Sequence, residues 1–496
     1  AEVMAERLQA DLDAHEAGEW RRHLNVLSSP LQHVRESFDL MATETVEDWS
    51  LLAERLVAVP DAVAGIRASL REGLSAGTTA ARRQALACAA QAHAWGAGAN
   101  GTGPYFARLV APFEDGSDAA LGARLEEGAA DAGRSFADLG TWLAEEYAPA
   151  AVTEDGVGAE RYALLARGWN GMELDLDDTY QWGWAELHRI EDEMTRVAAR
   201  ILPGAPLAEV KRLLDTDPAR AIEGEDRLVA WLQALMDEAM AGLDGRHFDI
   251  PEPLRRLEAM IAPPGGAAAQ YYTPPSEDFR RPGRTWYPTQ GRTRFPLWGE
   301  VSVAYHEGVP GHHLQLGMAQ FLKDRLNRFQ RFLAYTAGHG EGWALYGERL
   351  MGELGYLENP DYELGMLASQ AMRAVRVVVD IGLHLGLRIP DGERLNPGQR
   401  WTPELAAALL LERASQPAAF VASEVDRYLG LPGQAISYKV GERFWLAGRE
   451  AARRRAGAGF DLKAFHAGAL ELGPMGLADL ASRLEYCGGP SGPPHR

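Results

Sequence analysis

The stretch LWGEVSVAYHEGVPGHHLQL, residues 297–316, contains three of the thirteen histidines, with a glutamate directly after the first. His306 and Glu307 match the first half of the pattern H-E-x-x-H, in which two imidazoles bind zinc and the glutamate takes a proton from water. The second half is displaced, because His312 and His313 follow His306 by six and seven positions instead of four. The residue types predict a zinc-dependent hydrolase with an altered ligand spacing.

A straight helix cannot bring these histidines together. A residue six positions along a regular helix points about 240° away, and one seven positions along lies roughly two turns further on. Pro310 has no N–H to give to the His306 carbonyl, and Gly311 adds backbone freedom. We therefore predict a bulged or broken turn between Glu307 and His312, which returns one of the two later histidines to the metal.

A catalytic zinc usually has three protein ligands and a water. The best candidate for the third ligand is Glu341, in AGHGEGWALYGERLMGELG, 35 residues after His306. The apolar positions of this stretch predict a helix, on which Glu341 and Glu348 share one face. Glu348 is the rival ligand, and a helix-start carboxylate that binds no metal is the alternative for Glu341. We expect one zinc per chain.

A later predicted helix carries polar residues in a single stripe. Their spacings of three or four place them on one face: Arg373, Arg376, Asp380 and His384. An arginine in this position could clamp a peptide carboxylate through two hydrogen bonds. The alternative is an internal ion pair between Arg376 and Asp380.

A Pro-Gly break near the end of the chain gathers a second set of polar residues in an apolar setting: Arg427, Tyr428, Gln434, Tyr438 and Lys439. Tyrosine hydroxyls are good hydrogen-bond donors to a developing oxyanion. The alternative is a buried tyrosine whose hydroxyl is satisfied within the core.

Length and composition limit the class of protein. A chain of 496 residues suits about three domains or one large enzyme with two lobes. Its 50 basic and 70 acidic residues give a net charge of −20, which argues against nucleic acid or an anionic membrane as partner. The two cysteines exclude a disulfide framework. Since no apolar run reaches the roughly 18 residues of a membrane span, we expect a cytoplasmic protein, with a removed signal peptide as the open alternative.

The organisation of the chain follows from its periodicity. Amphipathic helices fill its first half. Residues 247–297 are rich in Pro, Gly and aromatic residues, with β-like pieces around Ala269–Tyr272 and Thr285–Tyr287, which predict a small antiparallel sheet beside the metal-binding helix. We expect a helical N-terminal lobe, a catalytic lobe and a disordered tail, at residues 1–246, 247–486 and 487–496.

Three longer motifs carry a family resemblance: H-E-G-V-P-G-H-H-L-Q, E-G-W-A-L-Y-G-E-R-L and R-Y-L-G-L-P-G-Q-A-I-S-Y-K-V-G. They resemble the DUF885 family, which is grouped with the gluzincin metallopeptidases, and the resemblance covers residues 270 to 480. It implies a mainly α, two-lobed, gluzincin-like fold with a deep cleft, and a sheet edge that binds an extended peptide. In related families the second zinc histidine follows a glycine, which favours His312 and leaves His313 beside the metal or substrate.

The resemblance also implies roles for the polar residues. Gluzincins commonly place a tyrosine or histidine opposite the zinc to stabilise the oxyanion, a role for Tyr438 first and Tyr428 second, with Arg427 beside them. Similar enzymes turn an Arg/Asp helix towards the substrate, which assigns substrate binding to the stripe that begins at Arg373. We expect the same role for Gln434 and Lys439.

Together these patterns predict a zinc metallopeptidase that hydrolyses short peptides, in the manner of a carboxypeptidase or an oligopeptidase. His306, His312 and Glu341 hold the metal, and Glu307 is the general base. Two other functions fit the same residues. One is a zinc amidohydrolase that acts on an aminoacyl or peptidyl small molecule, and the other is a catalytically inactive helical protein that binds peptides.

Overall fold

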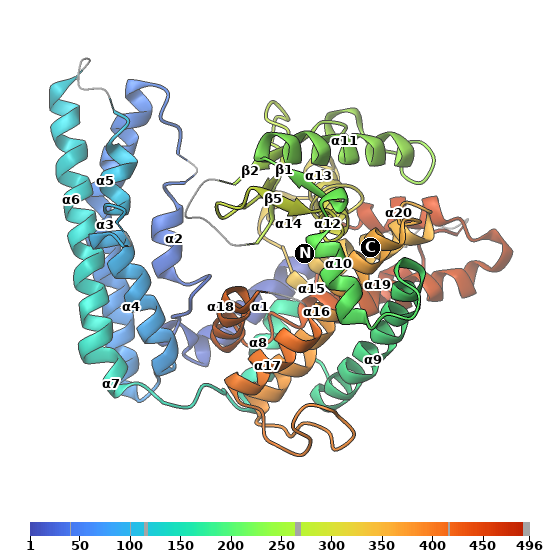
Figure 1. Cartoon of the computed structure of the whole chain (residues 1–496). Coiled ribbons are helices and arrows are strands. Elements are labelled where there is room, and N and C mark those ends of the chain that lie inside the picture. Colours follow the sequence, from blue (N-terminus) through green and yellow to red (C-terminus); the bar gives the residue numbers. More distant parts are fainter. Residues whose placement is uncertain (40, 100, 114–117, 263–268, 415–416, 490–496) are drawn as a thin grey trace.

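The helices of the first third of the chain form a stack of their own. The computed structural model describes residues 1–39, 41–99, 101–113, 118–262, 269–414 and 417–489. The first helices are α1 (Glu2–Glu16), α2 (Pro30–Glu36), α3 (Val46–Ala76), α4 (Arg82–Ala97), α5 (Tyr105–Val110), α6 (Ala119–Trp142) and α7 (Ala148–Ala150). Figure 1 shows α3, α4 and α6, in blue to cyan, side by side and apart from the rest of the chain.

This stack has its own apolar core, which runs from Leu24 to Ala151. Its longest helix, α3, begins at a capping box. The Thr45 hydroxyl accepts the N–H of Asp48 at 3.1 Å, and the Asp48 carboxylate accepts the N–H of Thr45 at 2.8 Å. The two residues thereby satisfy backbone donors that a helix start leaves without a partner.

A second and larger core contains buried residues from Tyr162 to Cys487. It is built by α8 (Ala159–Asn170), α9 (Leu176–Ile201), α10 (Leu207–Thr216), α11 (Glu225–Leu243), α12 (Glu300–Glu307), α13 (His312–Phe321), α15 (Ala337–Glu353), α16 (Pro360–Leu385), α17 (Pro403–Arg413), α18 (Ala418–Gly430), α19 (Ser437–Ala456), α20 (Leu462–Glu471) and α21 (Leu477–Leu484). The short helix α14 (Arg328–Phe332) contributes no buried residue. Nearly every residue of α16 from Leu364 to His384 is buried, so α16 is the central helix of this part.

Two small sheets lie between α9 and α12 in the sequence. Their strands are β1 (Ala221–Glu223), β2 (Leu257–Ile261), β3 (Tyr271–Thr273), β4 (Gly283–Tyr287) and β5 (Arg294–Pro296). Strands β1 and β5 form an antiparallel pair, and the three-stranded sheet has the order β2-β4-β3. Side chains of α11 and α12, including Leu232 and Ala304, pack on this sheet. The sheet therefore lies beside α12, as predicted.

The prediction that this sheet is antiparallel is wrong for one pair. Strand β3 runs antiparallel to β4, but β2 runs parallel to β4, with Ala259 opposite Thr285. The physical reason is the strand order. The chain crosses from β2 to the far edge, forms β3 there, and returns through the middle as β4, so β2 and β4 point the same way.

Helices α15 and α19 pack with their backbones in contact. A Cβ on Gly441 of α19 would lie 1.9 Å from the carbonyl oxygen of Gly338 on α15. Beside this contact the rings of Trp343 and Trp445 meet edge to face, with centroids 4.9 Å apart. The close approach sets the distance between the helices that carry Glu341 and Tyr438.

The prediction of a mainly helical chain with a small sheet is confirmed. The domain boundary expected at residue 246 stays a prediction, and the two large cores divide between Ala151 and Tyr162. Most of the expected tail, residues 490–496, lies outside the described residues. Cys487, at its start, is buried in the larger core.

The glycine contact gives a stability prediction. We expect Gly441→Ala to lower the free energy of unfolding by about 1–3 kcal/mol, because the added methyl group has to push the two helices apart. Thermal unfolding followed by circular dichroism measures this. Gly65→Ala is the matched control, since a Cβ there meets nothing within 4 Å and should stabilise α3 by up to about 1 kcal/mol. Equal melting temperatures for the two variants would contradict the packing argument.

Candidate metal centre

The backbone breaks between the first and second candidate histidines, as the sequence predicts. Helix α12 ends at Glu307, and α13 begins at His312. Between them the N–H of Gly311 donates to the carbonyl of Tyr305 at 3.1 Å. A Cβ on Gly311 would lie 1.9 Å from the carbonyl oxygen of His306, so only glycine fits. The break thus folds α13 back against the end of α12.

Helix α15 holds this turn from the other side. The indole N–H of the fully buried Trp343 donates to the carbonyl of Pro310 at 2.8 Å, and the Val309–Pro310 peptide bond is cis. Trp343 lies two residues after Glu341 on the same helix. The helix that carries the third candidate ligand therefore also positions the turn.

Three side chains converge at this break. The Nε2 atoms of His306 and His312 each lie 3.4 Å from Oε2 of Glu341, and the three candidate ligand atoms are within 4.8 Å of one another. Two ligands at zinc distance in a tetrahedron lie about 3.4 Å apart. Oε2 of Glu341 is buried and has no hydrogen-bond partner. Two imidazoles and one carboxylate are a zinc donor set, so these residues fit the metal.

Glu348, the rival ligand, holds the far side of His306 instead. Its Oε1 lies 2.8 Å from His306 Nδ1, and the Ser302 hydroxyl donates to its other oxygen. Burial alone lowers the pKa of His306, but the carboxylates of Glu341 and Glu348 outweigh burial and raise this pKa to about 9. A carboxylate on the outer nitrogen is the usual partner that orients a metal-binding histidine.

His313 is held away from the other three side chains. Its Nε2 lies 2.7 Å from the carbonyl oxygen of Leu254, and its Nδ1 lies 2.9 Å from the hydroxyl of Tyr272. Burial lowers the pKa of His313 to about 4, so its ring is neutral and both nitrogens are engaged. The structure thus brings His312 to the cluster and uses His313 to connect α13 with β3.

Glu307 shares a cleft with the three candidate ligands. The cleft has a volume of about 740 Å³, and its wall includes Tyr271 and Tyr272 of strand β3. Burial raises the pKa of Glu307 above that of an ordinary glutamate. A carboxylate with a raised pKa is a stronger base, which suits proton transfer near neutral pH.

Tyr438 also faces this cleft. Tyr438 belongs to α19, and its ring lies nearly parallel to that of His306, with centroids 6.4 Å apart. The guanidinium of Arg376 lies 4.8 Å from the centroid of the Tyr438 ring. Burial raises the pKa of Tyr438, so its hydroxyl keeps its proton and can donate a hydrogen bond. Tyr438 thus lines the same cleft as the three candidate ligands, and its role opposite the metal stays a prediction.

Arg373 and Arg376 both line the cleft, and the two guanidinium groups have different partners. Arg376 donates to the Tyr428 hydroxyl at 3.0 Å and to Glu424 at 2.7 Å, so it does not form the alternative ion pair with Asp380. Arg373 donates to the backbone carbonyl of Ser369 and lies 3.9 Å from a carboxylate oxygen of Glu348, while its buried Nε has no partner. Arg373 is therefore the less tightly paired of the two cleft arginines.

The remaining predicted site residues lie outside the cleft wall. Arg427 donates to Glu424 at 2.9 Å and to the side chain of Gln434, and Tyr428 donates to Glu424 at 2.7 Å. These contacts form a buried cluster behind Arg376. Arg427, Tyr428 and Gln434 thus support a wall residue, and the structure does not bring them to the metal residues.

Asp380 and His384 are fully buried between α16, α8 and the loop before α19. Asp380 accepts hydrogen bonds from the Tyr162 hydroxyl at 2.6 Å and from the N–H of Gly433 at 2.9 Å. His384 Nε2 lies 3.1 Å from the carbonyl oxygen of Tyr428. Neither side chain reaches the cleft, because the stripe that begins at Arg373 turns away from it along the length of α16.

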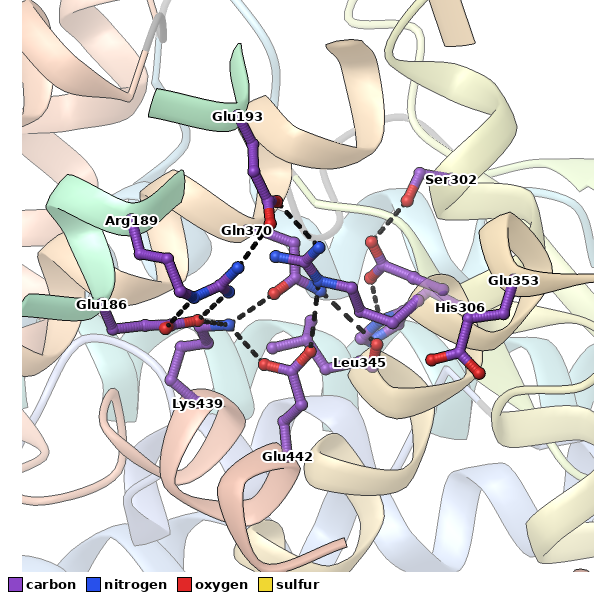
Figure 2. A network of polar contacts seen from close by, with 12 residues as sticks. Glu186, Arg189, Glu193, Ser302, His306, Leu345, Glu353, Gln370, Lys439 and Glu442 are labelled. Atoms are coloured by element: carbon purple, nitrogen blue, oxygen red, sulfur yellow. Dashed lines mark hydrogen bonds and ion pairs between the residues drawn. The ribbon is translucent and has the colours of Figure 1, made fainter. Parts of the chain in front are cut away.

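Lys439 lies in the buried network shown in Figure 2. Its Nζ is 2.6 Å from Oε1 of Gln370 and 2.8 Å from Oε1 of Glu186, and it also contacts Glu442. Only 1% of its surface is exposed. The ammonium group ties α19 to α9 and α16 through these contacts. Lys439 therefore fixes the helix that carries Tyr438, and the structure does not place it against a substrate.

Tyr335 is a site residue that sequence reasoning missed. Its hydroxyl lies 3.2 Å from Oε1 of Glu341, the oxygen that faces away from the two histidines, and its ring lines the cleft. Tyr335 belongs to the loop between α14 and α15, where no periodic pattern signals a role. The one signal in the sequence is its place six residues before Glu341.

The comparisons with known proteins agree with this fold. The profile of the family described as "Bacterial protein of unknown function (DUF885)" matches residues 1–484. The chain belongs to the DUF885 family. The match is broader than the span of residues 270 to 480 that the motifs suggest. A search of curated proteins gave no match.

Two solved structures resemble this DUF885 chain. One is described as a "putative lipoprotein" from Colwellia psychrerythraea, with 24% identity and a TM-score of 0.82, and the match covers 93% of this chain and 80% of that one. The other, from Shewanella oneidensis, has the same description with the words "of unknown function". It is 19% identical, with a TM-score of 0.66 and coverage of 93% and 82%. At these identities the likeness shows the fold of the DUF885 chain.

The expected cytoplasmic location is wrong by this comparison. Both matched structures are described as lipoproteins, a class of protein that a lipid anchor holds at a membrane surface. Within the described residues of the DUF885 chain, no helix combines the length and apolar character that crossing a membrane requires. The lack of a long apolar run, on which the expectation rested, does not bear on a lipid anchor.

The geometry predicts which variants lose zinc. We expect His312→Ala to weaken zinc binding by more than about a hundredfold, since loss of even an outer partner of a ligand costs roughly 10–100-fold. His313→Ala is the matched control and should keep the metal. Titration of the metal-free proteins with zinc, with plasma emission to count bound metal, measures both. Zinc loss in the His313 variant alone would contradict the arrangement.

Asp380 predicts a pH-dependent stability. Burial raises its pKa from 3.8 to about 7, so the folded chain keeps a proton that the unfolded chain releases. The stabilisation that this proton gives to the folded chain is complete below the pKa that Asp380 has in the unfolded chain. It is lost as the pH rises through the pKa that Asp380 has in the folded chain. From about pH 5 to pH 8 we expect the free energy of unfolding of the wild type to fall by on the order of 2 kcal/mol relative to that of Asp380→Asn. Chemical denaturation of both proteins across this pH range measures the difference. Unfolding free energies that change with pH in the same way in the wild type and in Asp380→Asn would contradict the prediction.

Proposed function

We propose that this chain is a zinc-dependent hydrolase of peptide bonds with a gluzincin-like catalytic arrangement. The observation that carries the proposal is the convergence of His306, His312 and Glu341 at spacings that suit one tetrahedral zinc. Glu307, directly after the first histidine, adds a buried carboxylate in the same cleft. This combination is what hydrolysis of an amide requires.

His306, His312 and Glu341 would hold the zinc, while Glu348 orients the ring of His306 from behind. Zinc supplies a Lewis acid that polarises a carbonyl group and lowers the pKa of water. Glu307 takes a proton from the water whose oxygen attacks the amide carbon. It then gives this proton to the amide nitrogen, so the C–N bond breaks and an amine leaves.

Tyr438 and Arg373 are placed to stabilise the negative charge that develops on the carbonyl oxygen. Both line the cleft, and the guanidinium of Arg373 lies 5.8 Å from the centroid of the Tyr438 ring. The tyrosine hydroxyl keeps its proton, and the arginine has a donor without a partner. Donors arranged before the reaction at the site of developing charge are a large part of catalysis.

The shape of the cleft favours short peptides. At about 740 Å³ it has the size of a small-molecule site, which favours a short peptide over a folded protein. Strand β3 (Tyr271–Thr273) is the edge strand of its sheet and contributes to the cleft wall, so an extended peptide can add to that edge. This supports a carboxypeptidase-like or oligopeptidase-like enzyme.

We place this activity at a membrane surface outside the cytoplasm. The support is the description of both matched structures as lipoproteins. Peptides at a cell surface are a suitable substrate for an enzyme with a narrow cleft. Fractionation of cells that express the complete gene product, followed by immunodetection, tests this part independently of the chemistry.

The decisive experiment is the substitution of the general base. We expect Glu307→Gln to keep one zinc per chain and to lose about 100- to 10,000-fold in turnover of a mixed peptide library read by mass spectrometry. A pool of aminoacyl amides tested in parallel separates a peptidase from an amidohydrolase of small molecules. Unchanged turnover in the variant would show that Glu307 is not the base. A wild-type protein that binds no zinc would leave only the peptide-binding alternative.

A further inference from the structure

A second cavity lies beside the catalytic cleft. It has a volume of about 860 Å³, comparable to the cleft itself, and falls within the range of ligand sites. Its wall is formed by α1, the segment that follows α1, the start of α4, α8 and the end of α18. The stack and the larger core therefore meet at this cavity. Among the described residues, one side chain of this wall also lines the catalytic cleft.

That side chain is Tyr335, which lines both cavities. Its hydroxyl contacts Glu341 on the side of the cleft, while 46% of its surface is exposed. Tyr335 thus borders both spaces, only one hydrogen bond away from a candidate zinc ligand. A chain-like ligand that extends from the cleft into the second cavity would have to pass Tyr335.

The chemistry of the wall selects among classes of ligand. The wall contains three arginines and four carboxylates: Arg7, Arg22, Arg161, Asp11, Glu19, Glu154 and Asp155. Because the two signs nearly balance, the wall does not suit a polyanion such as nucleic acid. Its many charges do not suit a lipid chain either. A peptide, which combines polar backbone groups with mixed side chains, matches this wall.

Individual wall groups can also bind a peptide directly. Gln84 of this wall is 2% exposed, and its Oε1 is buried beside Gly430 without a hydrogen-bond partner. Arg22 and Arg161 share the single carboxylate of Glu19. These three side chains therefore have a net charge of +1, which can attract a carboxylate of a peptide. Trp20 and Trp169 add aromatic surface to the wall.

We propose that this second cavity is a subsite for the distal part of a peptide substrate, the part beyond Tyr335 from the bond that is cleaved. The peptide is a substrate only if the proposed hydrolase function is right, but the subsite itself concerns peptide binding alone. An extended octapeptide measures roughly 26 Å, so it can occupy both cavities, whereas a dipeptide fills only the cleft. The chain would therefore prefer longer peptides over dipeptides.

The test fills the cavity without touching the cleft. Ala14→Phe on α1 places a ring in the second cavity, and Ala5→Phe, on an exposed part of the same helix outside that cavity, is the matched control. Both are made in the Glu307→Gln background, so that bound peptides are not consumed. Equilibrium dialysis with mixed octapeptide and dipeptide pools, read by mass spectrometry, measures binding. Leu165→Trp repeats the test from α8, on another wall, should the first variant fail to fold.

We expect Ala14→Phe to weaken octapeptide binding by at least about tenfold and to leave dipeptide binding within about twofold, with no change in Ala5→Phe. Octapeptide binding that is equal in the two variants, or absent in the parent, would overturn the subsite. If octapeptides bind in this manner but the wild type cleaves none, the subsite stands and the hydrolase proposal fails. If the wild type cleaves octapeptides and the filled cavity changes nothing, only the subsite fails.

Discussion

The close packing of backbone in the turn between α12 and α13 is the constraint on which the candidate site depends. Gly311 lies so close to the His306 carbonyl that a side chain has no room there. The ring of His312 is thereby brought back to a centroid distance of 4.8 Å from that of His306. Trp343 holds the turn through its indole N–H, and the helix of Trp343 supplies Glu341. One tight turn and one helix thus define the whole ligand set.

Behind this site lies a layer of buried ion pairs. Glu348 is paired with His306, Arg376 with Glu424, and Lys439 with carboxylates from α9 and α19. Buried ions without partners are costly, so such contacts specify the relative positions of the helices strongly. The helices that carry Glu341, Arg373 and Tyr438 are held in this way. The polar residues behind the cleft therefore hold the helices in position, and those on its wall are the ones that face the cleft.

The sequence predicts which residues gather at the candidate site better than it predicts the residues that support them. His306, Glu307 and Glu341 stand out by residue type and spacing, and the Pro-Gly pair indicates the broken turn. Glu341 and Glu348 share a helix face, but which one approaches Nε2 of His306 depends on the orientation of that ring in the folded chain. Lys439 resembles a site residue in the sequence, yet its partner Glu186 comes from a helix far away in the chain. The parallel pairing of β2 with β4 is likewise a tertiary choice that local patterns do not contain.

The most direct test of the account is a crystal of the zinc-loaded protein measured on both sides of the zinc absorption edge. The account predicts a single anomalous peak within bonding distance, about 2.0–2.2 Å, of His306 Nε2, His312 Nε2 and a carboxylate oxygen of Glu341. His313 should remain on Leu254 and Tyr272. A peak elsewhere, or none at this cluster at saturating zinc, would contradict the central claim.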